Sequence, residues 1–279
     1  MEKDRRDELD TEKANVRQFY DQVGWRQEGG RFVDTLLFDD VRPVSEDYRR
    51  KCNLRIKKYL NPSGRYFLDL GSGPVPYDEY VEIADRYHRR ICIDFSVVAL
   101  VEARKRLGDK GLYILGDITR LPLKNETVDA AIALHSIYHI PADQQSTAFA
   151  EMYRVLKPAS SGVVVYSGRY SFLVRLPFKI IQTIITLLRS VRASPNPAQP
   201  DLSPLYFHTH SYKWIAKELR NGYQFTLASW SSINVPFLHL CVHRWLLGKQ
   251  FLALIYFLED RFPYLLGRMG QYPMFILKK

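Results

Sequence analysis

The sequence predicts an α/β fold with a doubly wound, mostly parallel seven-stranded sheet, helices on both faces and an inserted helical cap. Short apolar runs alternate with helical stretches from residue 66 onward, and a glycine-rich turn follows the first run. Strands that are apolar throughout and alternate with helices are typical of a parallel sheet covered on both faces. Because crossover connections are right-handed, such a chain forms a doubly wound sheet.

The N-terminal segment predicts two helices, preceded by residues 1–13, whose alternating charges indicate a frayed, solvated helix start. Residues 15–25 place Val16, Phe19 and Val23 at helical spacing, and Gly24 ends the pattern. Residues 45–60 form a second helical stretch, which the breaker sequence NPSG follows. We expect residues 1–60 to form N-terminal helices that act as a lid.

The central segment, residues 61–167, predicts the cofactor-binding core of the fold. Five apolar runs have the length of buried strands, and helical stretches follow three of them. The expected strands are 66–70, 91–95, 112–115, 128–134 and 163–166, and the expected helices are 77–88, 97–107 and 143–156.

The C-terminal segment, residues 168–279, predicts the completion of the sheet together with the cap. Strands are expected near 223–230 and 272–277, with a helix over 210–221 before the first of them. Apolar, basic and aromatic insertions near 168–210 and 236–270 interrupt this pattern, and we expect a helix over 172–191. These insertions predict a cap that either encloses a ligand pocket or contacts a membrane surface through Arg175 and neighbouring cations.

The charge of the chain is concentrated in that last segment. The chain has 279 residues and a net charge of +10, and residues 168–279 carry 14 basic but only 4 acidic side chains. The basic residues never form a run, so we do not expect a nucleic-acid partner. No secretory signal or membrane span is recognisable, which predicts a cytoplasmic protein, either free or at the inner membrane surface.

The cysteines do not indicate a metal site or a disulfide framework. Cys52, Cys92 and Cys241 lie far apart and form no CxxC pair. We therefore expect reduced thiols and no metal.

Acidic residues and glycines follow successive predicted strands, which marks the expected ligand site. In an open parallel sheet, ligands bind beyond the carboxyl ends of the strands. A glycine turn follows the first strand, and a carboxylate lies at the end of each of the first three. The residues concerned are Asp69, Gly71 and Gly73 in the first, Asp94 in the second, Asp117 in the third, and His135 and His139 after the fourth.

The spacing of this site fits two cofactors. An acid about 20 residues after a glycine turn is typical of a carboxylate that accepts two ribose hydroxyls, and Asp94 lies 21 residues after Gly73. A nicotinamide dinucleotide is disfavoured, because Pro76 occupies the third glycine position of its fingerprint. Asp69 beside the turn also suits a cationic ligand better than a pyrophosphate.

The motifs FLDLGSGP, ICIDFS, LGDITRLPLKNETVDAAIALHSIYHI and EMYRVLKPAS resemble those of Rossmann-like S-adenosylmethionine-dependent methyltransferases of the type 11 kind. The resemblance covers residues 15–167 and returns weakly at FHTHSYKWIAKELRNGYQF. It implies S-adenosyl-L-methionine as cofactor and S-adenosyl-L-homocysteine as product. One departure is Val75, which stands where the family has its third glycine.

The resemblance also implies a role for each matched residue. It implies a glycine loop and an acid at the methionine end of the cofactor, a carboxylate at the ribose, a second carboxylate at the adenine, a floor under the sulfonium and an aromatic lid. The cofactor-binding residues so implied are Tyr20, Trp25, Asp69, Gly71, Ser72, Gly73, Asp94, Phe95, Asp117, Ile118, Leu134 and His135.

The expected reaction is O- or C-methylation of a small molecule, because the base-methylating motif of nucleic-acid methyltransferases is absent after the fourth strand. A hydroxyl acceptor needs a general base, and His139 is the preferred candidate, with His135 second. The acceptor is expected to be hydrophobic, and anionic or lipid-linked. Its candidate contacts are Tyr138, Tyr170, Arg175, Tyr206 and His208.

Two other functions stay open from the residues alone. One is a nicotinamide-dependent oxidoreductase on the same fold, and the other is a protein that binds the cofactor without catalysis. Neither the oligomeric state nor the methylated atom follows from the sequence.

Overall fold

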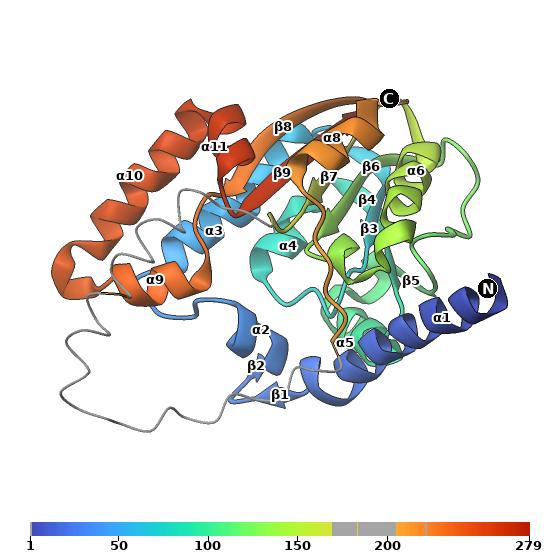
Figure 1. Ribbon diagram of the computed structural model, residues 1–279, viewed down its shortest axis with the longest axis horizontal. Coiled ribbons are helices and arrows are strands. Elements are labelled where there is room, and N and C mark those ends of the chain that lie inside the picture. Colours follow the sequence, from blue (N-terminus) through green and yellow to red (C-terminus); the bar gives the residue numbers. More distant parts are fainter. Residues whose placement is uncertain (1, 169–182, 184–204, 221) are drawn as a thin grey trace.

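The computed structural model describes residues 2–168, 183, 205–220 and 222–279, and a seven-stranded sheet lies at its centre (Figure 1). The strand order is β5-β4-β3-β6-β7-β9-β8. Only β9 runs antiparallel to its neighbours, so the predicted fold class is confirmed. The strands are β3 (Gly64–Leu70), β4 (Tyr87–Asp94), β5 (Gly111–Leu115), β6 (Val128–Leu134), β7 (Leu156–Val165), β8 (Gln224–Ser231) and β9 (Tyr272–Lys278).

The direction of winding changes between β3 and β6. Asp69 of β3 pairs with Cys92 of β4 on one side and with Ile132 of β6 on the other. The chain then proceeds outward through β4 and β5 on one side and through β7 on the other. A crevice therefore opens at the carboxyl ends of β3 and β6, where ligands bind in folds of this kind.

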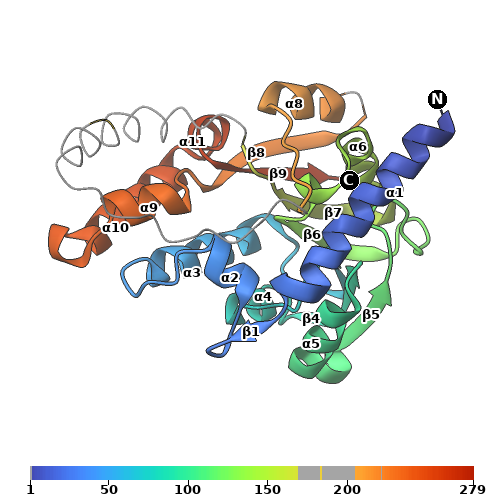
Figure 2. The ribbon, with the colours of Figure 1, turned by 60° about the horizontal axis from the view of Figure 1, so that its bottom comes forward.

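Helices cover both faces of the sheet (Figure 2). Phe67 and Leu68 face opposite sides because successive strand residues alternate, and they belong to two separate apolar clusters. One face packs against α6 (Gln145–Val155) and α8 (Tyr212–Arg220). The other packs against α3 (Glu46–Arg55), α4 (Asp78–Ile83), α5 (Val97–Leu107) and α10 (Gly248–Arg261).

The N-terminal segment is more extensive than predicted. Helix α1 spans Glu2–Phe19 and continues as a π-helical turn, η1 (Tyr20–Gly24). Its first turns have no apolar stripe, but Arg5 and Lys13 reach across to Asp143 and Asp117 at 2.6 and 2.7 Å. The hairpin of β1 (Gln27–Glu28) and β2 (Arg31–Phe32) and the short α2 (Val33–Phe38) follow, and neither was predicted.

One predicted helix is too long. The pattern over 77–88 predicted a helix to His88, but α4 ends at Ile83 and β4 begins at Tyr87. Tyr87 is buried against Phe67, with ring centroids 5.1 Å apart, and pairs with Gly64 in the sheet. Sheet pairing and aromatic packing therefore outweigh the helical pattern at this point.

The C-terminal segment adds β8, β9 and a group of helices. After α9 (Val235–Cys241) come η6 (Arg244–Leu246), α10 and α11 (Pro263–Met269). The helix predicted over 172–191 lies outside the described residues, apart from Thr183. Among the helices that the structure describes, none is long and apolar enough to span a bilayer.

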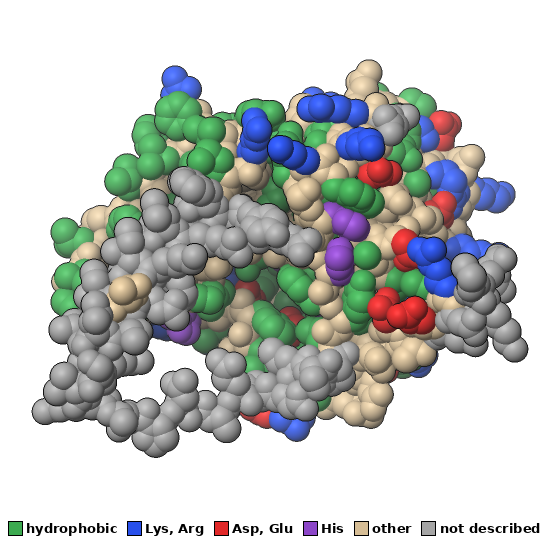
Figure 3. Space-filling model, viewed as in Figure 1, with side chains coloured by type: hydrophobic (Ala, Val, Ile, Leu, Met, Phe, Trp, Pro, Cys, Tyr) green, Lys and Arg blue, Asp and Glu red, His purple; other side chains and the backbone are tan. Residues whose placement is uncertain are grey.

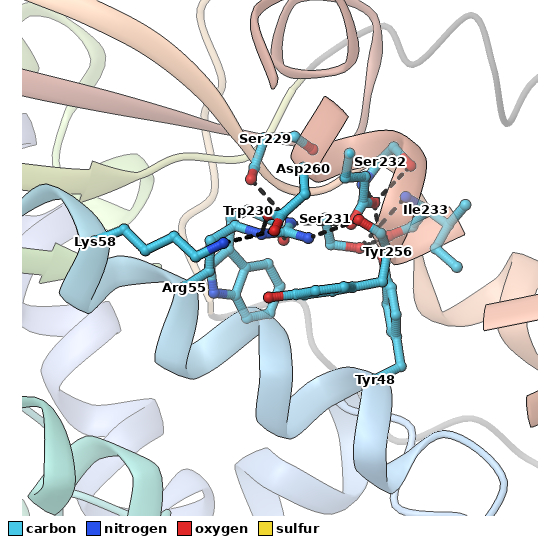
Figure 4. Close-up of polar contacts among 11 residues, drawn as sticks. Tyr48, Arg55, Lys58, Ser229, Trp230, Ser231, Ser232, Ile233, Tyr256 and Asp260 are labelled. Atoms are coloured by element: carbon cyan, nitrogen blue, oxygen red, sulfur yellow. Dashed lines mark hydrogen bonds and ion pairs between the residues drawn. The ribbon is translucent and has the colours of Figure 1, made fainter. Parts of the chain in front are cut away.

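A buried ion pair fastens α10 to α3 (Figure 4). Arg55 of α3 donates to Glu259 of α10 at 2.9 Å, and both side chains are almost fully enclosed. Tyr48 and Ser232 also donate to Glu259, at 2.7 Å each from their hydroxyls. The carboxylate therefore joins α3, α10 and the end of β8.

Candidate active site

A cavity of about 700 Å³ lies at the carboxyl ends of the central strands. Each of β3, β4, β5 and β6 contributes the residues that follow it. This volume is in the ordinary range of small-molecule pockets. The lining residues from these strand ends are Gly71, Ser72, Gly73, Asp94, Phe95, Ser96, Gly116, Ile118, Leu134, His135 and Ser136.

The glycine turn after β3 needs its glycines. Gly71 and Gly73 have φ of +67° and +55°, a region that side chains rarely adopt. A Cβ atom on Gly71 would lie 2.5 Å from Cβ of Ser136, and one on Gly73 would lie 3.1 Å from the ring of Trp25. The turn thus leaves a cradle in which backbone can approach a ligand.

Val75 adopts the conformation that glycine would take. Its φ is +55°, and its side chain is fully buried against Cys92, Leu100 and Ala103. A β-branched residue in this region is strained. The backbone path of the loop is therefore left-handed at the position where the family has glycine, and packing under α5 holds the valine there.

Asp94 lies at the tip of β4 and holds the glycine loop. Its carboxylate accepts hydrogen bonds from the backbone N–H groups of Gly73 and Ser96, both at 2.8 Å. Burial raises the pKa of Asp94 to about 6, although these two bonds act in the opposite direction. Each carboxylate oxygen has a second lone pair, so the group can still accept from a ligand.

Two aromatic residues of the N-terminal segment cover this loop. Tyr20 and Trp25 stack with ring centroids 4.8 Å apart, and both line the cavity. The Trp25 Nε1 is buried and has no hydrogen-bond partner among the described residues. A glycine cradle and a carboxylate therefore face one cavity beneath an aromatic cover, and this set fits a polar cofactor with ribose hydroxyls.

Comparisons with known proteins agree with this geometry. Residues 68–164 match the sequence model of a methyltransferase domain. This part of the chain is a Rossmann-like, S-adenosylmethionine-dependent methyltransferase domain. The predicted family resemblance and the predicted cofactor are confirmed.

Two relatives and one solved structure illustrate the similarity. A demethylmenaquinone methyltransferase of Protochlamydia amoebophila is 32% identical over 39% of this chain and 48% of its own length. A ubiquinone/menaquinone C-methyltransferase of Desulfotalea psychrophila is 26% identical over 67% and 76%. The first match thus spans only about half of the relative. The geranyl diphosphate C-methyltransferase of Streptomyces coelicolor shares the fold, with a TM-score of 0.55, 13% identity and coverage of 96% and 97%.

Asp69 of the methyltransferase domain does not lie where we expected it. It forms a buried ion pair with Arg90, whose Nε donates at 3.1 Å, and it does not line the cavity. Its side chain points to the same face as Phe67 because β3 alternates. The prediction that it faces the cofactor is corrected to a role in joining β3 to β4.

Asp117 is also set back from the cavity, although Gly116 and Ile118 line it. Its carboxylate accepts from Lys13 of α1 and from Thr119, each at 2.7 Å. Burial alone would raise its pKa, but these hydrogen bonds outweigh burial and lower the pKa of Asp117. In this structure its expected adenine contact is replaced by an ion pair with Lys13 of α1.

The two candidate histidines differ in their surroundings. His139 has both ring nitrogens engaged, Nδ1 with the carbonyl of Tyr206 at 3.0 Å and Nε2 with the Tyr20 hydroxyl at 3.3 Å. His135 has φ of +59° and lies edge-on to Trp230, 4.7 Å between centroids. Burial lowers the pKa of His135 to about 3 and that of His139 to about 4, so both are neutral at pH 7.

The expected acceptor contacts are only partly brought to the cavity. Tyr138 lines it, whereas Tyr206 and His208 do not; the neighbouring Leu205 and Phe207 do instead. The Tyr206 hydroxyl accepts from the backbone of Ala142 and so points away. Successive side chains of an extended segment point to opposite sides, so Leu205 and Phe207 face the cavity while Tyr206 and His208 face away from it. Tyr170 and Arg175 lie outside the described residues.

Several cavity residues were not anticipated from the sequence. Asp34 and Asp39 enter from the α2 region, and Trp230 and Tyr272 come from β8 and β9. Burial, and then the neighbouring Asp39, raise the pKa of Asp34 to about 8. The only sequence signal for Asp34 and Asp39 was that the apolar stretch FVDTLLFDD contains three acids, and this stretch does not follow a predicted strand.

No metal centre is apparent in the described part of the chain. Nowhere in residues 2–168, 183, 205–220 and 222–279 do three His, Cys, Asp or Glu side chains gather closely enough to hold an ion.

Proposed function

We propose that the chain transfers a methyl group from S-adenosylmethionine to a small apolar acceptor, by O- or C-methylation, as an enzyme of the EC 2.1.1 type. The observation that carries this proposal is the single cavity that joins two unlike regions. One end is formed by the glycine turn and Asp94, and the other by Trp230 and Tyr272.

At the cofactor end, the proposed contacts are backbone and carboxylate. Gly71, Ser72 and Gly73 would receive the amino-acid part, Asp94 the ribose hydroxyls, and Phe95 with Ile118 the adenine. Leu134 and His135 would lie under the sulfonium, and Tyr20 with Trp25 above it. The cofactor supplies the electrophilic methyl group, and the protein aligns the acceptor, which can contribute ~7–11 kcal/mol.

At the acceptor end, the lining favours a neutral ring over an anion. The ionisable lining residues of the described cavity include four aspartates but only two arginines. Arg17 is 3.4 Å from Asp21, and Arg49 is 3.7 Å from Glu79. Nε and Nη1 of Arg49 are nevertheless buried without a hydrogen-bond partner among the described residues, so the excess of carboxylates, rather than a lack of cations, disfavours an acceptor phosphate. A reduced quinone or related phenol, as the relatives' names suggest, would fit the aromatic wall.

We further propose that Asp34 takes the proton of a hydroxyl acceptor. Asp34 lines the cavity and makes no hydrogen bond or ion pair with the described residues, whereas both nitrogens of His139 are engaged. His135 is the alternative, and His139 would then position Tyr20. A base whose pKa is about 8 is suited to neutral pH, whereas a pKa of about 3 makes His135 a weak base.

The cofactor assignment is tested by calorimetry with S-adenosylhomocysteine. Asp94→Ala should weaken binding at least about tenfold, because hydrogen bonds to a charged group contribute ~1.5–3 kcal/mol. Asp109→Ala, an exposed acid outside the cavity, serves as the matched control. Equal affinity of the Asp94 variant and the wild type would contradict the assignment.

The activity is tested with labelled S-adenosylmethionine and a panel of reduced quinones, phenols and amines. We expect methyl transfer to a quinol or a phenol. The transfer rate should be at least about tenfold lower in Asp34→Asn. Binding of S-adenosylhomocysteine without transfer to any acceptor would favour the alternative of a non-catalytic binding protein. The nicotinamide alternative has no support, because residues 68–164 match the methyltransferase domain.

We also propose that the enzyme works in the cytoplasm. Fractionation of cells that express the chain would locate it, and recovery from an extracellular fraction would contradict this.

A further inference from the structure

The outward side of the C-terminal helices is apolar. We define the outer α10 face as the exposed large apolar side chains of η6, α10, α11 and their junctions. In Figure 3 hydrophobic side chains gather over α10 and α11, at the upper left of the view. The face consists of Trp245, Leu246, Leu247, Phe251, Leu254, Phe257, Leu258, Phe262, Tyr264 and Leu265.

The exposure of this face is unusually high. Trp245 is 79% exposed, Leu247 67% and Phe257 61%. Single exposed apolar residues are ordinary on protein surfaces, but a contiguous patch marks an interaction site. Ten such side chains within 21 residues of sequence therefore indicate an interaction surface.

Helix α10 is apolar on its outer side as well as on its inner side, where Leu252 is buried against the sheet. Leu247, Leu254 and Leu258 recur at helical spacing on the outer side, whereas Glu259 is completely buried on the inner side. The carboxylate of Glu259 is paired with Arg55 on that inner side. The arrangement turns the apolar stripe outward and holds it there.

The unpaired exposed charges around the outer α10 face are cations. Arg244, Lys249, Arg261 and Arg268 are exposed, and none forms an ion pair with a described residue. Of the two acids between residues 236 and 270, one is Glu259. The other, Asp260, is turned toward the body, 2.6 Å from Lys58 and 3.2 Å from Arg55.

We propose that the outer α10 face docks the protein onto an anionic lipid bilayer. An amphipathic helix with basic residues lies in the plane of a membrane interface with its apolar side among the acyl chains. Trp245 and Tyr264 suit the headgroup region, where aromatic rings with one polar atom are enriched. The four cations match the negative potential of such a surface, and the exposed acid of α10, Asp260, is neutralised by Lys58 and Arg55.

This surface adjoins the wall of the cavity along the chain. Val235, Pro236 and Leu238 of α9 line the cavity, and η6 with Trp245 follows within a few residues. Docking would place the acceptor end of the cavity near the bilayer. Membrane binding itself does not rest on the proposed methyl transfer, and its test needs no acceptor.

The experiment measures sedimentation of the full chain with vesicles of phosphatidylglycerol and phosphatidylcholine, compared with phosphatidylcholine alone. We expect preference for the anionic vesicles, weakening as salt is raised. Lys249→Gln should weaken binding about fivefold, the contribution of one cation near a charged surface. The double variant Leu254→Ser, Phe257→Ser should weaken it at least about tenfold.

The matched control is Val98→Ser, Val101→Ser, which replaces exposed apolar residues of α5. It should bind vesicles as the wild type does. Equal binding by the α10 double variant would overturn the proposal, as would no binding of the wild type to anionic vesicles. A stable dimer that the α10 substitutions dissociate would assign the face to a second copy instead and would also overturn it.

Discussion

Removal of the Glu259 carboxylate should strongly destabilise the protein. In Glu259→Ala, the guanidinium of Arg55 would stay buried and lose its fully buried acidic partner at 2.9 Å, keeping only the partly exposed Asp260 at 3.2 Å. The Tyr48 hydroxyl would lose one acceptor but keep Ser231 at 2.9 Å. The backbone N–H of Ser232, which donates to Glu259 at 2.6 Å, would lose its acceptor.

The expected loss follows from the burial of both partners. Removing one partner of a buried ion pair costs about 3–5 kcal/mol, since the other charge stays desolvated. For a chain of this size, each kcal/mol lowers the melting temperature by about 2–4 °C. We therefore expect a decrease of about 6–20 °C.

Urea unfolding and thermal melts, followed by circular dichroism, measure this change. Asp260→Asn is the control, because Asp260 is partly exposed and its pairs should contribute less than about 1 kcal/mol. The double variant Arg55→Met, Glu259→Leu should lose less than Glu259→Ala alone, because no charge is left unpaired. A loss below about 1 kcal/mol in Glu259→Ala would refute the reasoning.

Three further predictions concern the cavity. The pKa of Asp94 is raised to about 6, so its carboxylate becomes protonated as the pH falls below that value. The affinity for S-adenosylhomocysteine should therefore decrease at low pH. Calorimetry from pH 5 to 8 should show a flatter pH profile for Asp94→Asn than for the wild type. Val75→Gly should be no less stable in urea than Val75→Ala, because relief of the left-handed strain, ~1–3 kcal/mol, offsets the additional lost methyl group. A glycine variant that unfolds at a clearly lower urea concentration than the alanine variant would contradict this. Trp25→Ala should weaken cofactor binding by up to about tenfold, since it removes the stack on Tyr20, and a Trp245→Ala control should leave the affinity unchanged.

The sequence predicted those parts of the fold that local patterns determine. Helix α5 begins at Val97 and ends at Leu107 as expected, because its apolar stripe is regular and Ser96 caps it. All seven strands of the main sheet were anticipated. The start of α1 was expected only as a frayed, solvated helix start, because no local pattern reports the long-range ion pairs from Lys13 and Arg5 that hold it.

The candidate site was predictable where it depends on backbone turns. Gly71, Gly73 and Asp94 line the cavity because their places after the strands fix them. Asp69 has an equally suggestive place, yet Arg90 pairs with it across the sheet, which only the register of β3 and β4 reveals. Asp34 was missed because it comes from a short helix that tertiary packing positions.

The place of β9 in the sheet constrains how the molecule is assembled during synthesis. β9 is last in the chain but second from the edge in space, bonded to β7 on one side and to β8 on the other. β8 therefore cannot join the sheet until Tyr272–Lys278 of β9 have emerged from the ribosome. Because Trp230 and Tyr272 lie on these two strands, this wall of the cavity forms only after β9 has been synthesised. Loss of the C-terminal strand would remove an interior strand and separate β8 from the sheet.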